Sequence, residues 1–441
     1  MIDIFDILLP PIYLLTILFI AHKYKTIHEK EHIAFKYFMP GLIAKIIGAI
    51  SLGLVYFYYY KGGDTFNYHT TAKTLVNLLY ESPTDFFYVY FGNPTASEYY
   101  LMRPTGNFVF WVTDGYGYFV SKCFVPFEII AGKSYMTTAI LVASVCFISV
   151  WQLFMVFVKQ FPNLSKQLSI PILFMPSVIF WGSGILKDSL TLSATCLYVY
   201  GFYWLIVQKK FDLKYWFAII FSIYLLLSIK PYVFFALLPG SILWIVFIVM
   251  KLFKKGLMKL FGTPIIILIA IVVGYLVINN LESKLGQYSL DKVMETASVA
   301  QQDLKQSYYK GNAFDIGNYK PTFSGIASVS HKAIFASLFR PTLLDAKNIV
   351  MFFSAIENTV ILFFCLILLY KLKIFGFFRM INANPLVLFS FIFSIFFALS
   401  VGLSISNFGT LVRLKIPSIP FFMASLVIIG EYAKTENKNI T

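Results

Sequence analysis

Long runs of apolar residues recur along almost the whole chain and constrain its fold more than any other feature. Hydrophobic residues make up 59% of the 441 and charged residues only 13%, which is more apolar surface than a soluble domain carries. A membrane span needs roughly 20 mainly apolar residues. The sequence therefore predicts an all-α fold, a polytopic transmembrane helix bundle that forms a single membrane domain over residues 1–441. About eleven stretches qualify as spans: 5–21, 40–60, 134–158, 168–184, 189–208, 214–229, 232–250, 263–280, 349–370, 384–404 and 416–433.

Basic residues gather in connections that fall on one side of the membrane if these spans alternate. Cytoplasmic loops carry an excess of Lys and Arg, so this side is predicted to be the cytoplasm. The same loops explain the net charge of +15 without nucleic acid as a partner. The protein is then integral to the cytoplasmic membrane, with its acidic N-terminus outside. The basic residues concerned are Lys23, Lys25, Lys30, Lys36, Lys159, Lys166, Lys209, Lys210, Lys214, Lys251, Lys254, Lys255, Lys259, Lys371, Lys373, Arg379, Lys434 and Lys438.

The two longest connections, 61–133 and 281–348, both fall on the outer side in this topology. The inner loops are too short for a folded domain that binds ATP or a soluble activated sugar, and we find no P-loop or GxGxxG pattern. The four cysteines form no CxxC or Cys/His cluster, so neither a disulfide framework nor a structural metal is indicated. No cofactor is indicated, and a divalent metal is left open. The chemistry is therefore expected at the outer face.

The first outer connection opens with a glycine pair followed by Asp64. The glycines allow a sharp turn as the chain leaves the membrane, and a helix with Ala72, Leu75, Val76 and Leu79 on one face is expected next. Asp64 is a candidate general base, with His69 as a nearby helper. The alternative interpretation is that Asp64 only caps this helix.

A second candidate lies in the Gly182–Ser189 connection between two spans. Lys187 and Asp188 stand where a returning helix would present its positive end, which favours a bound anion. An ordinary helical hairpin explains the same residues equally well. Amphipathic helices are also expected within 61–133, one of them between about 107 and 132.

Arginine is the third feature, because only four of the 36 basic residues are Arg. Three of them, Arg103, Arg340 and Arg413, fall at predicted outer boundaries, and Lys230 lies at the same level. Arg suits bidentate recognition of phosphate, although each side chain alone could instead reach the lipid head groups. Their convergence from separate loops favours an anion site.

This arrangement resembles the GT-C superfamily of polytopic glycosyltransferases, which use polyprenyl-phosphate sugars. Those enzymes place a catalytic Asp after a span and before an amphipathic helix, and Asp64 with its following helix matches that position. Outer-face Arg and Lys residues of the family hold the lipid phosphate, and the resemblance implies this role for Arg103, Lys187, Lys230, Arg340 and Arg413. Asp188, next to Lys187, is a further candidate for substrate binding. The chain departs from the family in having an extra first span, and in showing only Asp64 where members often carry paired acidic residues.

The resemblance implies transfer of a sugar from a lipid-linked donor to a glycan or lipid acceptor at the outer face, in cell-surface glycan or polysaccharide assembly. Asp64 would take the acceptor's proton, and the basic groups would stabilise the leaving phosphate. Two alternatives stay open. One is an O-antigen or exopolysaccharide polymerase that uses polyprenyl-pyrophosphate glycans, and the other is a non-enzymatic flippase for lipid-linked oligosaccharides.

Overall fold

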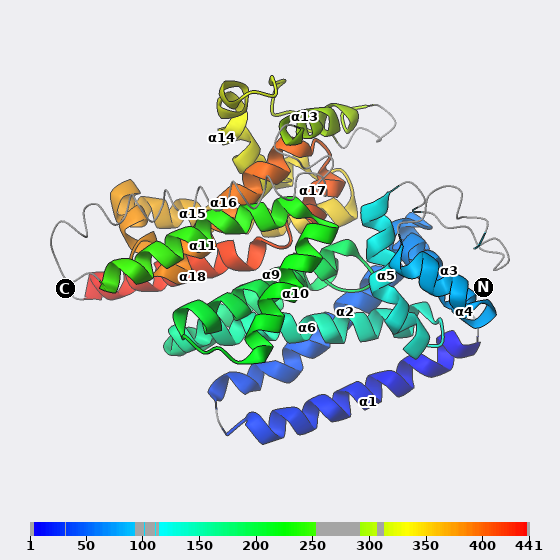
Figure 1. The fold of residues 1–441 in the computed structure, drawn as a ribbon. Helices are drawn as coiled ribbons and strands as arrows, with labels where there is room; N and C mark the ends of the chain where they lie inside the picture. Colours follow the sequence, from blue (N-terminus) through cyan, green and yellow to red (C-terminus); the bar gives the residue numbers. More distant parts are fainter. Residues whose placement is uncertain are drawn as a thin grey trace. The chain divides into compact units, whose positions relative to one another are not determined.

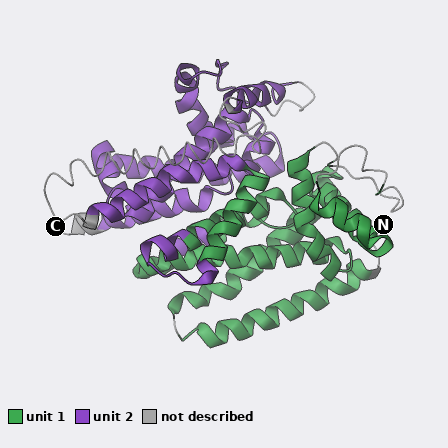
Figure 2. Ribbon diagram, viewed as in Figure 1, with its two compact units in different colours: residues 1–165, 173–201, 216–230 green, residues 166–172, 202–215, 231–441 purple. Residues whose placement is uncertain are grey.

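The structure is a computed structural model that describes residues 4–30, 32–92, 101, 111, 114–252, 292–306 and 313–438. Helices account for all of the regular elements in these ranges, which confirms the predicted all-α fold. The one β-type pairing among them is an isolated bridge between Ala313 and Asn407. Figure 2 shows that the chain divides into two compact units. How the units combine into the predicted single membrane domain stays a prediction.

Unit 1 comprises residues 1–165, 173–201 and 216–230. Its second helix, α2, packs against α6 and α8, and α1 packs along α6 (Figure 1). A pair of shorter helices, α3 and α5, pack closely on each other. The elements are α1 (Ile4–His28), η1 (Ile33–Tyr37), α2 (Phe38–Val55), η2 (Tyr56–Tyr60), α3 (Asp64–Glu81), α4 (Pro83–Phe91), α5 (Gly115–Ile130), α6 (Tyr135–Gln160), η4 (Pro162–Leu164), α8 (Pro176–Trp181) and most of α9 (Lys187–Phe202) and α10 (Leu213–Ile229).

Unit 2 comprises residues 166–172, 202–215 and 231–441. Its core forms around α16, which packs against α11, α14 and α18 and buries Phe389, Phe393 and Phe397. The elements are η6 (Tyr203–Val207), α11 (Pro231–Leu252), α13 (Val293–Asp303), α14 (Phe323–Phe339), η9 (Leu343–Asp345), α15 (Ile349–Ile381), α16 (Pro385–Ser404), α17 (Phe408–Leu414) and α18 (Ile419–Lys438); α7 (Ser165–Ser169) and η5 (Ile170–Phe174) contain residues of both units.

Seven helices in the described ranges are long and apolar enough to cross a membrane, or eight if the bent pair α17 and α18 is one span. These two helices meet at 68°. The seven are Phe5–His28, Ile33–Tyr60, Tyr135–Gln160, Lys187–Val207, Pro231–Met250, Ile349–Ile381 and Pro385–Ser404. They support a multi-pass membrane protein. The total of about eleven stays a prediction, because the expected span at 263–280 lies outside the described residues.

The expected span at 168–184 is not a continuous helix. It consists of the end of α7, η5 and α8. Proline explains the interruptions, since its ring removes one backbone donor and forces the preceding residue out of the helical region. Pro171 lies in η5, and Met175, just before Pro176, has the extended angles φ −63° and ψ 123°.

Gly48 allows α2 to touch the backbone of α8. A Cβ atom on Gly48 would lie 2.0 Å from the carbonyl oxygen of Ile179, a distance that no rotamer change can relieve. We therefore expect Gly48→Ala to lower the free energy of unfolding by about 1–3 kcal/mol, the usual range for overpacking. Thermal unfolding of the purified protein in detergent measures the effect.

The matched control for this substitution is Gly115→Ala at the start of α5, where no atom lies within 4 Å of the added carbon. Equal stability of Gly48→Ala and Gly115→Ala would show that α2 and α8 are not packed at this distance.

Candidate functional site

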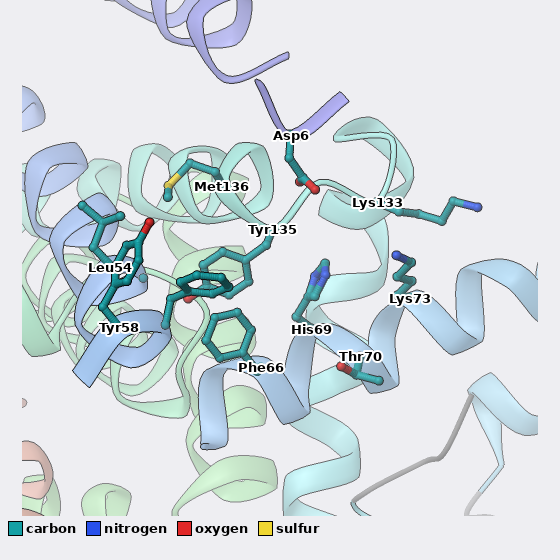
Figure 3. Close-up of a pocket in the computed structure, with 12 residues that line it drawn as sticks. Asp6, Leu54, Tyr58, Phe66, His69, Thr70, Lys73, Lys133, Tyr135 and Met136 are labelled. Carbon is teal, nitrogen blue, oxygen red and sulfur yellow. The ribbon is translucent and has the colours of Figure 1, made fainter. Parts of the chain in front are cut away.

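A cavity of about 470 Å³ lies in unit 1 where the ends of three candidate spans meet (Figure 3). Asp6 stands in the first turn of α1, Tyr58 near the end of the second span, and Tyr135 at the start of the third. These three helix ends meet around the cavity, and because each helix is long and apolar enough to span a membrane, we expect the cavity to lie at a membrane boundary. Its lining residues are Asp6, Gly53, Leu54, Phe57, Tyr58, Phe66, His69, Thr70, Lys73, Lys133, Tyr135 and Met136.

Local backbone geometry brings the lining residues together from both sides. Lys61, Gly62 and Gly63 all have positive φ, at 55°, 137° and 120°, and this turn leads from η2 directly into α3. Gly132 and Lys133, with φ of 59° and 66°, make a second turn from α5 into α6. The first turn confirms the bend that the glycine pair predicts. The second places Lys133 and Tyr135 beside the end of α5.

His69 is hydrogen-bonded to a buried carboxylate. Its Nδ1 lies 2.7 Å from Oε1 of Glu128, which comes from α5 and is 0% exposed. Among the described residues, Nε2 of His69 has no hydrogen-bond partner. A histidine held by a carboxylate through one nitrogen can exchange a proton through the other. This pair is the clearest acid–base group of the cavity.

An aromatic residue, Tyr135, packs against the imidazole of His69. Tyr135 meets the imidazole edge-on, with ring centroids 5.4 Å apart and an interplanar angle of 88°. The Tyr135 ring also stacks on Phe66 at 4.6 Å, and its hydroxyl is 2.8 Å from Oγ1 of Thr65. Tyr135 is therefore fixed at both ends of its side chain, and it restricts how the imidazole can rotate.

Two lysines form a basic edge next to His69 (Figure 3). Lys73 follows His69 by one helical turn on α3, and it forms no hydrogen bond or ion pair with any other described residue. Lys133 donates to the amide oxygen of Asn77 at 3.0 Å, which leaves its charge without a carboxylate partner in the same ranges. Both ammonium groups are thus suited to attract an anionic group.

The opposite wall of the cavity is apolar and aromatic. It consists of Leu54, Phe57, Tyr58, Phe66 and Met136, which come from α2, η2, α3 and α6. The cavity therefore has one side for an apolar chain and another for a charged head group. Among the described residues, no three His, Cys, Asp or Glu side chains are grouped to hold a metal ion.

The structure places Asp64 at the first position of α3, with Gly63 as the N-cap. Asp64 is partly exposed and is not among the residues that line the cavity. A carboxylate in a helix's first turn is stabilised by the helix dipole. The expected helix after Asp64 is confirmed, and Ala72, Leu75 and Val76 on it are fully buried.

Lys187 and Asp188 begin α9, as the sequence suggests, but Asp188 already has a cationic partner. Its Oδ1 accepts a hydrogen bond of 2.6 Å from Nζ of Lys230, which follows α10. Both side chains are almost completely buried, at 0% and 4% exposure. Two of the residues predicted to bind the donor therefore form an ion pair inside unit 1. Lys187 is more exposed than Asp188.

In unit 2, Arg340 binds Asp345 through two hydrogen bonds, Nη2 to Oδ1 at 2.5 Å and Nε to Oδ2 at 3.1 Å. The guanidinium also lies over the rings of Phe408 and Phe314, 4.9 and 5.5 Å from their centroids. Burial alone would raise the pKa of Asp345, but the hydrogen bonds from Arg340 and Thr342 hold that pKa below its ordinary value. The guanidinium of Arg340, which was expected to bind a phosphate, is thus already paired with a carboxylate.

Two further residues predicted to bind the donor are Arg413 and Arg103. Arg413 lies in the last turn of α17, next to the buried Lys415. Lys415 donates to Oδ1 of Asn358 at 2.5 Å. Arg103 lies outside the described residues. Asp64, Lys187 and Lys230 belong to unit 1, whereas Arg340 and Arg413 belong to unit 2, so their convergence on one anion site stays a prediction.

Five residues of the cavity and its supporting pair were not predicted as site residues from the sequence: Glu128, Lys73, Lys133, Tyr135 and Asp6. Glu128 gave a detectable signal, since a lone carboxylate in an apolar helix usually has a buried partner. Nothing in the sequence paired it with His69, which lies 59 residues away. The two lysines look like ordinary solvated charges until the turn at Gly132 brings Lys133 next to α3.

No family model, curated protein or solved structure matches this chain.

Proposed function

We propose that this chain is a membrane glycosyltransferase that moves a sugar from a polyprenyl-phosphate donor to a glycan or lipid acceptor, at the outer face of the cytoplasmic membrane. The observation that carries the proposal is the two-sided cavity at the ends of three spans. Its apolar wall suits the first units of a polyprenyl chain, and Lys73 and Lys133 suit the phosphate. Polyprenyl phosphates combine these two properties in one molecule and reside in the bilayer next to such a cavity.

In the proposed step, the oxygen of an acceptor hydroxyl forms a bond with the anomeric carbon of the sugar. The bond between that carbon and the phosphate oxygen breaks, and its electron pair leaves with the lipid phosphate. The hydroxyl's proton passes to a base in the cavity. Lys73 and Lys133 stabilise the charge that grows on the phosphate oxygen, and one preorganised donor of this kind contributes roughly 3 kcal/mol to such steps.

The test is a transfer assay with the full chain in lipid nanodiscs, offered polyprenyl-phosphate sugars and polyprenyl-pyrophosphate glycans separately. We expect turnover of the first. The Lys73→Gln and Lys133→Gln variants should each raise the KM for the donor by roughly 10-fold or more, because each removes a charged hydrogen bond to phosphate. Lys25→Gln is the matched control, since Lys25 lies towards the other end of α1 and pairs with Glu29.

Each result of this assay has a defined meaning. Turnover of the pyrophosphate donor alone would make the chain a polymerase of lipid-linked glycans. Movement of a lipid-linked glycan across the bilayer without turnover would make it a flippase. If the KM for the donor is unchanged in both lysine variants, the donor's phosphate does not bind in this cavity.

A further inference from the structure

Glu128 is the most unusual charged residue of unit 1, because it is fully buried and its two oxygens have different surroundings. Oε1 contacts His69 at 2.7 Å, whereas Oε2 has no hydrogen-bond partner among the described residues. A buried carboxylate normally has several donors around it, since leaving one oxygen unsatisfied costs about 1–3 kcal/mol or more. Such an arrangement calls for an explanation in terms of what the group does.

We infer that Glu128 is a positioning residue that holds His69 with its proton on Nδ1, so that Nε2 is the nitrogen that accepts a proton in the cavity. An ionised Glu128 can only accept hydrogen bonds, and in that state the proton between Oε1 and Nδ1 belongs to the imidazole. The second ring nitrogen of a neutral imidazole is then unprotonated. Because Glu128 does not line the cavity while His69 does, this unprotonated Nε2 is the atom left for a substrate hydroxyl.

The buried carboxylate of Glu128 favours this role. When Nε2 takes a proton, the imidazole becomes a cation and Glu128 gains a full counter-charge at hydrogen-bond distance. A buried carboxylate stabilises such a cation strongly, because the interior screens the attraction less than water does. The buried negative charge of Glu128 thus gains a counter-charge from His69 when the proton is transferred. Tyr135 keeps the ring in the plane that allows this contact.

This inference rests on the proposed function only for the source of the proton, which is the acceptor hydroxyl as the glycosidic bond forms. His69 is then the general base in place of Asp64, which does not line the cavity. The arrangement of Glu128 and His69 itself is a property of the protein without substrate, so it can be tested without any turnover.

The primary test is nitrogen NMR of the full chain labelled with ¹⁵N-histidine in detergent micelles, at a pH where His69 is neutral. His69 is assigned from the spectrum of His69→Gln. We expect one predominant tautomer with the proton on Nδ1. In Glu128→Gln, whose amide is close in size but neutral, we expect a mixture of tautomers, with the share of the Nδ1-protonated form falling several-fold.

His28 supplies the matched control in the same spectra. Its Nδ1 contacts the backbone oxygen of Tyr24 at 2.9 Å, and its ring contacts Tyr24 and Phe35 rather than α5, so Glu128→Gln should leave its signals unchanged. A predominant Nε2-protonated form of His69 in the wild-type protein would overturn the inference, since Glu128 would then be a protonated donor. A wild-type tautomer that persists in Glu128→Gln would also overturn it.

A kinetic comparison separates positioning from a purely structural part. With a donor that the wild-type protein turns over, Glu128→Gln should lower kcat by roughly 10-fold or more and leave KM nearly unchanged. If kcat and the folded yield fall by the same factor, Glu128 only stabilises the fold and does not position His69. If no donor is turned over, the proposed function fails, and the NMR result alone decides whether Glu128 positions His69.

Discussion

Replacing His69 with glutamine is expected to slow transfer by roughly 10²- to 10⁴-fold, the usual contribution of a positioned general base. Glutamine can still contact Glu128, but it has no basic nitrogen for the acceptor's proton. The loss should therefore appear in kcat, with the KM for the donor changed little. Steady-state rates of the purified variant in nanodiscs, with saturating donor and acceptor, measure both quantities.

Asp64→Asn provides the comparison that decides between the two candidate bases. Asp64 is the general base predicted from the sequence, whereas the cavity is lined by His69 and not by Asp64. We expect Asp64→Asn to retain most of the wild-type kcat, because asparagine is tolerated in the first turn of α3. His28→Gln is the control for the loss of a histidine elsewhere. A larger loss in Asp64→Asn than in His69→Gln would restore Asp64 as the base and make His69 its helper.

The ion pair between Asp188 and Lys230 should give the largest effects on stability. Removing one partner leaves the other charge buried without this counter-charge, and breaking a buried ion pair in this way typically costs about 3–5 kcal/mol. We expect Asp188→Asn and Lys230→Met to reduce the folded yield sharply when made singly. The double variant should recover much of the loss, since both charges of the pair are then removed together.

Fluorescence-detected size-exclusion chromatography and thermal unfolding of the three variants measure this recovery. Lys187→Met is the matched control, because Lys187 is the neighbouring, more exposed lysine. Additive losses in the double variant would show that the two side chains do not interact. A double variant that folds normally but no longer transfers sugar would support the donor-binding part that the sequence analysis gives to Asp188 and Lys230.

The apolar periodicity of the sequence predicted the helical elements well. Ala72, Leu75 and Val76 repeat at helical spacing, and they form the buried face of α3. The glycine pair before Asp64 likewise predicted a real turn. Both signals are local, because they depend on residues within a few positions of one another.

The candidate site was harder to predict, because its essential contacts join distant segments. Asp188 was predicted to belong to an anion-binding site, but in the structure it pairs with Lys230, which is 42 residues away in the sequence. Arg340 was predicted to bind a phosphate, but its guanidinium is hydrogen-bonded to Asp345. Charged residues in an apolar chain can be recognised from the sequence, but their partners depend on which helices pack together.

The size of the cavity has a consequence for how such a protein would discriminate between lipids. A space of about 470 Å³ admits a head group and only the nearest part of a long hydrocarbon tail. The remainder of the tail would stay among the bilayer's acyl chains and contribute little to recognition. Tail length would then govern only how much lipid the membrane retains, and a truncated, freely diffusing analogue should be chemically equivalent once its concentration is matched.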